Sequence, residues 1–331
     1  MAAPTPASQA GMRRLNLSLV LTTVAAHGPL SRAGVAARTG LTRAAVSSLV
    51  DELMAGGLLD EAGPAERSGR AGRPGTALQL SRTGPAGLGL EVGVEHIAGC
   101  VVDLRGQVRA EERAECPNRG RSAVDVMPEL AALAGRLVDR AEAEGLRPVG
   151  TALAVPGLTD GSSGTVEHAP NLGWRRAPVG ELLAKLLPES LRERPLTVEN
   201  EANLGALAEL WAGGGAGLDD FVHVSAEGGI GAALVVDGRL LRGARGFAGE
   251  LGHVPVYPRG PVCACGAHGC LEQYAGEAAV LAGAGIEVPA DASLDRVRLL
   301  AERAGAGDRR VRGRCAGPGR RWGWPWPGRS T

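Results

Sequence analysis

The 331-residue sequence is poor in several residue types. It has one lysine among 36 basic residues, and aromatic residues make up 3% of the chain. The 36 acidic residues balance the basic ones, so no net charge draws the whole protein to nucleic acid or to a membrane. No stretch approaches the roughly 18 consecutive apolar residues of a membrane span. Six cysteines are too few for a disulfide scaffold in a chain of this length, and we expect a cytoplasmic protein.

The start of the chain allows one alternative to a cytoplasmic location, which is export. Arg13 and Arg14 precede the apolar segment 15–26, a layout that also occurs in export signals. Polar residues interrupt this segment, and its apolar side chains repeat at helical spacing. We therefore interpret 1–14 as a disordered N-terminus and 15–26 as the first helix of a small domain.

Two further helices follow, separated by a turn. Ser31 and Thr42 are residues that cap helices, and Gly40 can adopt the positive φ of a tight turn between them. The three predicted helices cover residues 15–26, 32–39 and 43–56. A third helix that opens with small polar and basic side chains after such a turn is typical of a helix-turn-helix.

A glycine-rich loop with three arginines completes this domain. Predicted strands at 58–61 and 76–80 bracket the loop, which carries Arg67, Arg70 and Arg73. Helix-turn-helix, strands and loop together predict a winged helix-turn-helix domain over residues 15–82.

The charge of this domain suits double-stranded DNA. Residues 1–50 contain five arginines and no acid. The third helix can enter the major groove and the arginine loop the minor groove, while phosphates supply most of the affinity. We predict DNA contacts from Thr42, Arg43, Ala44, Ser47, Ser48, Arg70 and Arg73. The alternative is a helical dimerisation domain with solvated arginines.

From residue 88 onward, strand-like segments alternate with predicted helices, which indicates an α/β layer structure. Six motifs occur in this region: VPG at 155–157, APNLGW at 169–174, VENEAN at 198–203, GGIG at 228–231, GELGH at 249–253 and CACGAHGCLE at 263–272. In this order they resemble the ROK family (repressors, open reading frames and kinases), and the winged helix in front resembles the ROK transcriptional regulators. The resemblance implies an actin/hexokinase-like, ribonuclease H-like domain over residues 86–311.

Three cysteines within eight residues indicate a metal site. His253, Cys263, Cys265 and Cys270 supply one imidazole and three thiolates, a complete tetrahedral set for a structural Zn²⁺. Free thiols in a loop are the alternative. The resemblance favours His253 over His268 as the fourth ligand.

The resemblance also implies a sugar site. The family positions that match Asn200, Glu201, Glu250, His253 and Glu272 surround a hexose, with Asn171 close by. Carboxylates and amides suit this role because each can pair with two neighbouring hydroxyls. His253 would then serve both the metal and the sugar.

Two positions argue against the kinase activity of the family. ROK kinases have an aspartate where this chain has Glu201, and a hydroxyl residue in the first phosphate loop where it has Glu95. A longer carboxylate misplaces the base, and a carboxylate facing phosphates repels them. Glu227 adds a further acid to the second phosphate loop. We expect no enzyme, although an ATP-dependent ROK sugar kinase stays the alternative.

These elements predict a sugar-responsive regulator, most simply a repressor of carbohydrate genes. A homodimer would bind operator DNA, and a sugar or sugar derivative would change the dimer geometry. An activator would use the same residues.

The last residues depart from the family pattern. Residues 309–331 hold seven arginines and no acid, with tryptophans at 322, 324 and 326 among glycines and prolines. We interpret 312–331 as an aberrant tail from a frameshift, which leaves the last layer of the ROK domain missing. A tail that stacks on bases and a non-functional truncated product are the alternatives.

Overall fold

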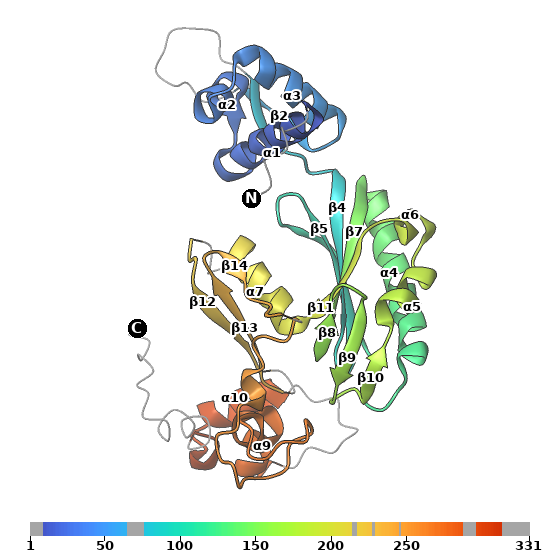
Figure 1. The fold of residues 1–331 in the computed structure, drawn as a ribbon, viewed down its shortest axis with the longest axis vertical. Helices are drawn as coiled ribbons and strands as arrows, with labels where there is room; N and C mark the ends of the chain where they lie inside the picture. Colours follow the sequence, from blue (N-terminus) through green and yellow to red (C-terminus); the bar gives the residue numbers. More distant parts are fainter. Residues whose placement is uncertain are drawn as a thin grey trace, which may run out of the picture.

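The computed structural model describes residues 9–64, 76–213, 217–226, 229–244, 246–286 and 296–312. A helical N-terminal domain is followed by a longer α/β region (Figure 1). Arg70, Arg73, Glu227 and the segment 313–331 lie outside the described residues. Within the part that is described, no helix has the length and apolar character needed to cross a bilayer.

Three helices and a small antiparallel sheet form the N-terminal domain. Its elements are α1 (Gln9–His27), β1 (Leu30–Ser31), α2 (Arg32–Thr39), α3 (Arg43–Ala55), β2 (Leu59–Pro64) and β3 (Thr76–Leu80). The sheet order is β1-β3-β2. Val20, Val35, Leu49 and Leu78 are buried at the centre, so one apolar stripe of each helix closes over the sheet. This arrangement is the predicted winged helix.

The local signals at the turn act as expected. Ser31 Oγ accepts a hydrogen bond from the backbone N–H of Gly34, and Thr42 Oγ1 accepts one from Ala45. Gly40 adopts φ +73° and ends α2. The caps satisfy backbone donors that a helix start would leave without partners, which fixes where α2 and α3 begin.

The first helix differs from the prediction. It begins at Gln9, inside the segment that we expected to be disordered. Arg13 lies in this added part and donates from Nε to Glu52 Oε2 of α3 at 2.9 Å. This pairing between helices places an additional turn of α1 against α3, which no local pattern at 9–14 indicates.

A five-stranded sheet is the centre of the α/β region. Its strands are β4 (Gly84–Val92), β5 (His96–Asp103), β6 (Val108–Glu115), β7 (Leu146–Val155) and β11 (Leu196–Asn200), in the order β11-β7-β4-β5-β6. β11, β7 and β4 are parallel, whereas β5 and β6 are antiparallel additions. This is a ribonuclease H-like order, and it brings the carboxyl ends of β4, β7 and β11 to one edge.

Helices cover one face of this sheet (Figure 1). They are α4 (Ala123–Ala143), α5 (Val179–Leu186) and α6 (Glu189–Arg192). Gly99 of β5 allows α4 to approach closely, because a Cβ there would lie 2.7 Å from Leu137 Cδ1 and 2.9 Å from Leu133 Cδ2. A separate sheet of β8 (Leu158–Asp160), β9 (Thr165–Ala169) and β10 (Trp174–Ala177) continues beyond β7.

The second half of the region is smaller. It contains α7 (Glu201–Ala212), β12 (Phe221–Ser225), β13 (Gly231–Val236), β14 (Arg239–Leu240), η1 (Leu251–His253), α8 (Glu272–Ala275), α9 (Glu277–Gly283) and α10 (Arg296–Gly305). Ala233 and Val235 of β13 pack against α7. Val222 and Val224 of β12 are 57% and 52% exposed, so this described sheet has one helix-covered side and one open side.

Candidate functional site

One histidine and three cysteines meet after η1. Ligand atoms of His253, Cys263, Cys265 and Cys270 all lie within 4.8 Å of one another. A tetrahedral Zn²⁺, with bonds of about 2.3 Å to sulfur and about 2.0 Å to nitrogen, holds its ligand atoms about 3.6–3.8 Å apart. Cys263 Sγ lies 3.6 Å from His253 Nδ1, and Cys265 Sγ lies 3.7 Å from Cys270 Sγ. The donor set therefore fits a tetrahedral metal ion.

Glycines allow the loop to fold around this cluster. Gly266 and Gly269 adopt φ +92° and +66°. A Cβ on Gly269 would lie 1.6 Å from the carbonyl oxygen of Tyr257, so no other residue fits there without moving the backbone. His268 is exposed, and its Nδ1 contacts Gly260 O at 3.3 Å. The geometry thus includes His253 and leaves His268 outside the cluster.

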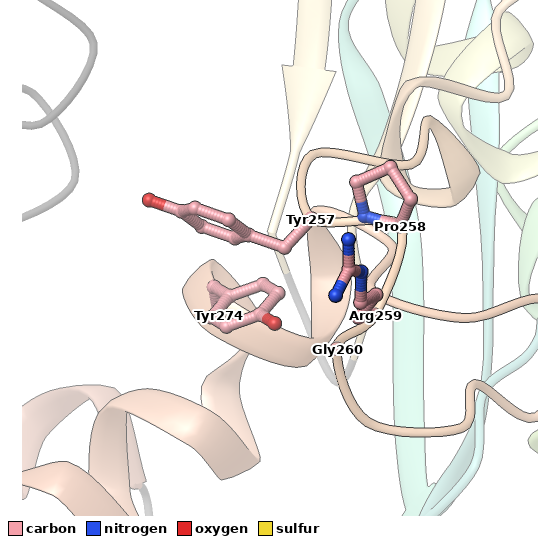
Figure 2. A pocket seen from close by; sticks show the side chains of 5 residues that line it. All are labelled: Tyr257, Pro258, Arg259, Gly260 and Tyr274. Atoms are coloured by element: carbon pink, nitrogen blue, oxygen red, sulfur yellow. The ribbon is translucent and has the colours of Figure 1, made fainter.

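Two tyrosines, Tyr257 before the cysteines and Tyr274 of α8, lie next to each other (Figure 2). The rings of Tyr257 and Tyr274 meet edge to face with centroids 4.9 Å apart. With Pro258, Arg259 and Gly260 they line a shallow hollow of about 440 Å³. Edge-to-face packing of this kind adds to the rigidity of the turn that precedes the cysteines.

The three thiols are so close that ionisation of one disfavours ionisation of the others. Burial and the neighbouring thiols Cys265 and Cys263 raise the pKa of Cys270 to about 12. Three close thiolates need a cation to become stable, and a bound metal ion deprotonates a coordinating thiol outright. The chemistry of the cluster, like its geometry, is therefore compatible with a bound metal ion.

Asn171 and Glu272 converge on the described end of the second glycine loop. A Cβ on Gly229 would lie 2.5 Å from Glu272 Oε2 and 3.4 Å from Asn171 Nδ2, so only glycine admits both side chains. Glu272 Oε2 also accepts a hydrogen bond from the backbone N–H of Ile230 at 3.0 Å. Two predicted sugar residues from distant parts of the chain are therefore neighbours.

Glu250 and His253 adjoin this pair. His253 Nε2 lies 3.8 Å from Glu250 Oε2. Burial and the nearby Glu272 carboxylate raise the pKa of Glu250, while His253 opposes that rise. Glu250, His253 and Glu272 therefore form one cluster, in which the imidazole lies between the cysteines and Glu250.

Asn200 and Glu201 lie where β11 meets α7. Asn200 Oδ1 accepts hydrogen bonds from the backbone N–H groups of Ala202 and Asn203, and its Nδ2 donates to Gly157 O at 2.9 Å. Asn200 thus caps α7 and ties it to the VPG motif. Its second amide N–H has no acceptor among the described residues and could donate to a ligand. Glu201 Oε1 would lie 4.0 Å from a Cβ on Gly231, at the other end of the glycine loop.

Glu199 and His168 also lie near these residues, and the sequence did not indicate either of them. The buried Glu199 carboxylate accepts hydrogen bonds from Asn203 Nδ2 at 2.9 Å and Arg242 Nε at 3.0 Å, so it joins β11 to the segment after β14. His168 of β9 has a lowered pKa because of burial, Arg175 and His253. VENEAN contained Glu199, but no local pattern indicates its distant partner Arg242.

The first glycine loop, between β4 and β5, is filled by its own side chains. The ring of His96 lies on Gly93, where a Cβ would come within 2.2 Å of it. Gly93 N donates to His96 O at 2.9 Å, and His96 Nε2 lies 3.2 Å from Glu91 Oε1. Asn118 Nδ2 closes the loop by donating to Gly93 O at 2.9 Å. Glu95 is exposed at the outside of this loop.

The start of α3 presents the predicted DNA-contact residues. Thr42, Arg43, Ala44 and Ser48 are exposed, and Ser47 is half-buried. Val46 and Leu49 point into the core, so the contact residues share the outer face of the helix. A polar, basic helix start on a winged helix is the arrangement that reads a major groove.

These features define a class of protein: a winged helix joined to an actin/hexokinase-like α/β domain that carries a His/Cys₃ cluster. The chain belongs to the ROK family, whose profile matches residues 87–309, and the MarR family profile matches residues 18–73.

Relatives include both regulators and kinases. The xylose repressor of Caldicellulosiruptor bescii is 34% identical over 270 residues, which are 82% of this chain and 66% of that protein. This chain therefore spans a little under two thirds of that relative's length.

Solved structures agree with this pattern. A ROK family transcriptional regulator, a homolog of the E. coli MLC protein, matches with a TM-score of 0.73 and 26% identity over 94% of this chain and 78% of that one. A ROK family glucokinase from Streptomyces griseus, in complex with glucose and AMPPNP, matches with a TM-score of 0.57 and 28% identity over 69% and 74%.

Proposed function

We propose that this protein is a sugar-responsive transcriptional repressor that binds operator DNA through its winged helix. One observation carries the proposal: the same chain places an exposed, polar helix start on α3 and a carboxylate cluster around Gly229 in a separate domain. The xylose repressor and the regulator homologous to the MLC protein support it. A cytoplasmic location follows from the proposed DNA target and remains part of this proposal.

The ligand is a sugar, with a pentose or hexose as the first candidate. Asn171, Glu250, His253 and Glu272 offer the carboxylates, amide and imidazole that pair with vicinal hydroxyls. Asn200 and Glu201 complete the site from the α7 side. The family's relatives include a xylose repressor and a glucokinase, so xylose and glucose are the sugars to test.

The metal is Zn²⁺ in a structural role. Three thiolates and one imidazole fill a tetrahedral coordination sphere and leave no position for a reactive water. Cys263, Cys265, Cys270 and His253 would hold the ion, which would tie the cysteine loop to η1. His253 Nε2, which lies 3.8 Å from Glu250 Oε2, would remain available on the side of the proposed sugar site.

The first glycine loop argues against kinase activity. A phosphate loop offers free backbone N–H groups to phosphate oxygens, but here Gly93 N donates to His96 O and the His96 ring covers the glycine. Glu95 adds a negative charge at the loop, and Glu201 stands where the kinases have an aspartate. Relatedness to a glucokinase keeps kinase activity as the second candidate function.

The repressor works as a homodimer on two half-sites. Sugar binding favours a dimer geometry that no longer matches the operator, so ligand and DNA weaken each other by the same factor. The test is operator affinity with and without xylose or glucose, on a duplex that the protein itself selects from a random-sequence library. We expect affinity to fall about 5- to 150-fold.

The same preparation discriminates between the two functions. Sugar phosphorylation is measured with ATP, xylose and glucose under the conditions of the DNA assay. If the protein phosphorylates either sugar and selects no operator, its function is that of a kinase and the repressor proposal is wrong. Operator selection without turnover supports the proposal.

A further inference from the structure

The hairpin between β5 and β6 reaches across to the segment that leaves the winged helix. Arg105 donates from Nε to the carbonyl oxygen of Leu80 at 2.8 Å, and its Nη2 donates to the same atom. Arg109 donates from Nη1 to the carbonyl oxygen of Arg82 at 2.7 Å. Leu80 is the last residue of β3, so two guanidinium groups of one hairpin hold the end of the DNA-binding domain.

A buried carboxylate fixes this hairpin. The Asp103 side chain is 1% exposed, and its Oδ1 accepts hydrogen bonds from the backbone N–H groups of Arg105 and Gln107 at 2.9 and 3.0 Å. Its Oδ2 lies 3.3 Å from Arg109 Nη1, and Glu144 Oε2, just after α4, accepts from Arg109 Nη2 at 2.7 Å. A charge buried with several partners holds one geometry, because any displacement leaves it without hydrogen bonds.

The same segment packs on the turn that follows α3. Ser81 N donates to Leu58 O at 3.0 Å, and Ser81 Oγ donates to Asp60 Oδ2 at 2.7 Å. Gly84 lies directly against Gly57, since a Cβ on Gly84 would stand 2.7 Å from the carbonyl oxygen of Gly57. The linker, residues 81–84, is therefore in contact with the turn after α3 and with β2 on one side, and with the hairpin on the other.

The five-stranded sheet connects this region with the sugar site. β4 begins at Gly84 in the linker and ends at Val92, beside the first glycine loop. β7 runs parallel to β4 and ends at Val155, two residues before the Gly157 carbonyl that Asn200 holds. A hydrogen-bonded sheet moves as a rigid element. A rotation of the sheet at the sugar site reaches the hairpin at the other end.

We propose that Arg105 and Arg109 are positioning residues that lock the winged helix to the first half of the ROK domain. Movement of the sheet is thereby passed to α3 instead of being absorbed by the linker. This proposal rests on the proposed function for its consequence, because the coupling matters only if sugar and DNA bind to the two domains. The lock itself is a property of the structure and can be measured without either ligand.

The central variant is Arg105→Ala combined with Arg109→Ala in the full chain. Arg140→Ala is the matched control, because Arg140 also donates a guanidinium hydrogen bond to a backbone carbonyl, that of Glu111, at 3.1 Å. The Arg140 bond lies within the ROK domain and does not involve the linker.

Hydrogen exchange and calorimetry test the lock without ligands. The double variant should show faster exchange at the amides of Ser81 and Gly84 and a separate, earlier unfolding transition for the N-terminal domain. The wild type and Arg140→Ala should keep both slow exchange and a single transition. Equal exchange and equal transitions in all three proteins would overturn the lock.

Operator binding tests its consequence. Each protein is titrated with the selected duplex, with and without xylose and glucose. The double variant should bind the duplex within about threefold of the wild type but show a sugar effect below about twofold, against the range of 5- to 150-fold typical of coupling. Relative to the double variant, Arg105→Lys combined with Arg109→Ala should restore part of the sugar effect, because one ammonium can still donate to Leu80 O.

The two proposals fail in different ways. A wild type whose operator affinity ignores every sugar contradicts the proposed function, while the exchange and calorimetry results still decide the lock. A wild type that responds, alongside a double variant that responds equally, contradicts the role of Arg105 and Arg109 and leaves the repressor intact.

Discussion

His253 and Glu250 form the contact between the His/Cys₃ cluster and the carboxylates of the proposed sugar site. Nε2 of His253 lies 3.8 Å from Glu250 Oε2, while Nδ1 of the same ring lies 3.6 Å from Cys263 Sγ. An imidazole held through one nitrogen has a fixed ring plane, so a metal bound at the cluster would set how the other nitrogen meets a ligand.

Removal of the metal should abolish sugar binding before it abolishes the fold of the winged helix. Wild-type protein should contain one Zn²⁺ per chain, and Cys265→Ser should contain much less, with at least a tenfold loss of xylose or glucose affinity, the size typical of lost metal-site support. Metal analysis and calorimetric titration measure both. Cys100→Ser, outside the cluster, is the control. Full zinc content in Cys265→Ser would contradict the site.

Glu272→Gln should weaken sugar binding about 10- to 150-fold, since hydrogen bonds to a charged group contribute about 1.5–3 kcal/mol. The glutamine carbonyl can still accept from Ile230 N, where Glu272 Oε2 accepts at 3.0 Å, so the local fold should persist. Titration calorimetry against sugar is the measurement. Glu189→Gln, an exposed change on α6, should leave affinity as in the wild type. Unchanged affinity in Glu272→Gln would remove Glu272 from the sugar site.

Arg43→Ala should weaken operator binding at the start of α3. A contact to a base should cost about 1–3 kcal/mol and relax specificity at one position, whereas a contact to a phosphate should lower the salt slope by about one. Fluorescence anisotropy over a salt series separates these cases. Arg136→Ala removes the same charge from the ROK domain, where Arg136 pairs with Glu112, and should have no effect. If both variants bind alike, α3 is not the reading helix.

Gly84→Ala should destabilise the protein more than Gly106→Ala. Both glycines have positive φ, +87° and +75°, so both variants carry the cost of that conformation, about 1 kcal/mol. Only at Gly84 would the new Cβ meet a neighbour, the carbonyl oxygen of Gly57 at 2.7 Å, while Gly106 has nothing within 4 Å. Urea unfolding should show the difference. Equal losses would mean that the linker does not pack tightly on the turn after α3.

Much of the N-terminal domain could be predicted because its signals act over one helical turn. Ser31, Gly40 and Thr42 set the ends of α2 and α3 through hydrogen bonds and a backbone conformation of their own residues. The start of α1 could not be predicted, since it depends on Arg13 meeting Glu52, 39 residues away. The arginine loop that completes the prediction lies beyond the described part of the chain.

In the candidate site too, features set by residues close in the sequence could be predicted, and contacts between distant residues could not. The spacing of Cys263, Cys265 and Cys270 indicated a metal, and resemblance to the ROK family supplied His253, which the geometry then placed within the cluster. Arg242 as the partner of Glu199, and the ring of His96 over Gly93, had no signal in the order of the residues. The sugar role of the six predicted residues stays a prediction.

The amino-acid order by itself determined the ligand types at the cysteine cluster, the caps of the recognition helix and the alternation of strands and helices, because each depends on residues close along the chain. Only the tertiary structure decided that Arg105 would meet Leu80 and that Glu272 would meet Asn171 at Gly229. Those meetings depend on how strands pair and helices pack over long separations, and the packing selects one arrangement from many that local preferences allow.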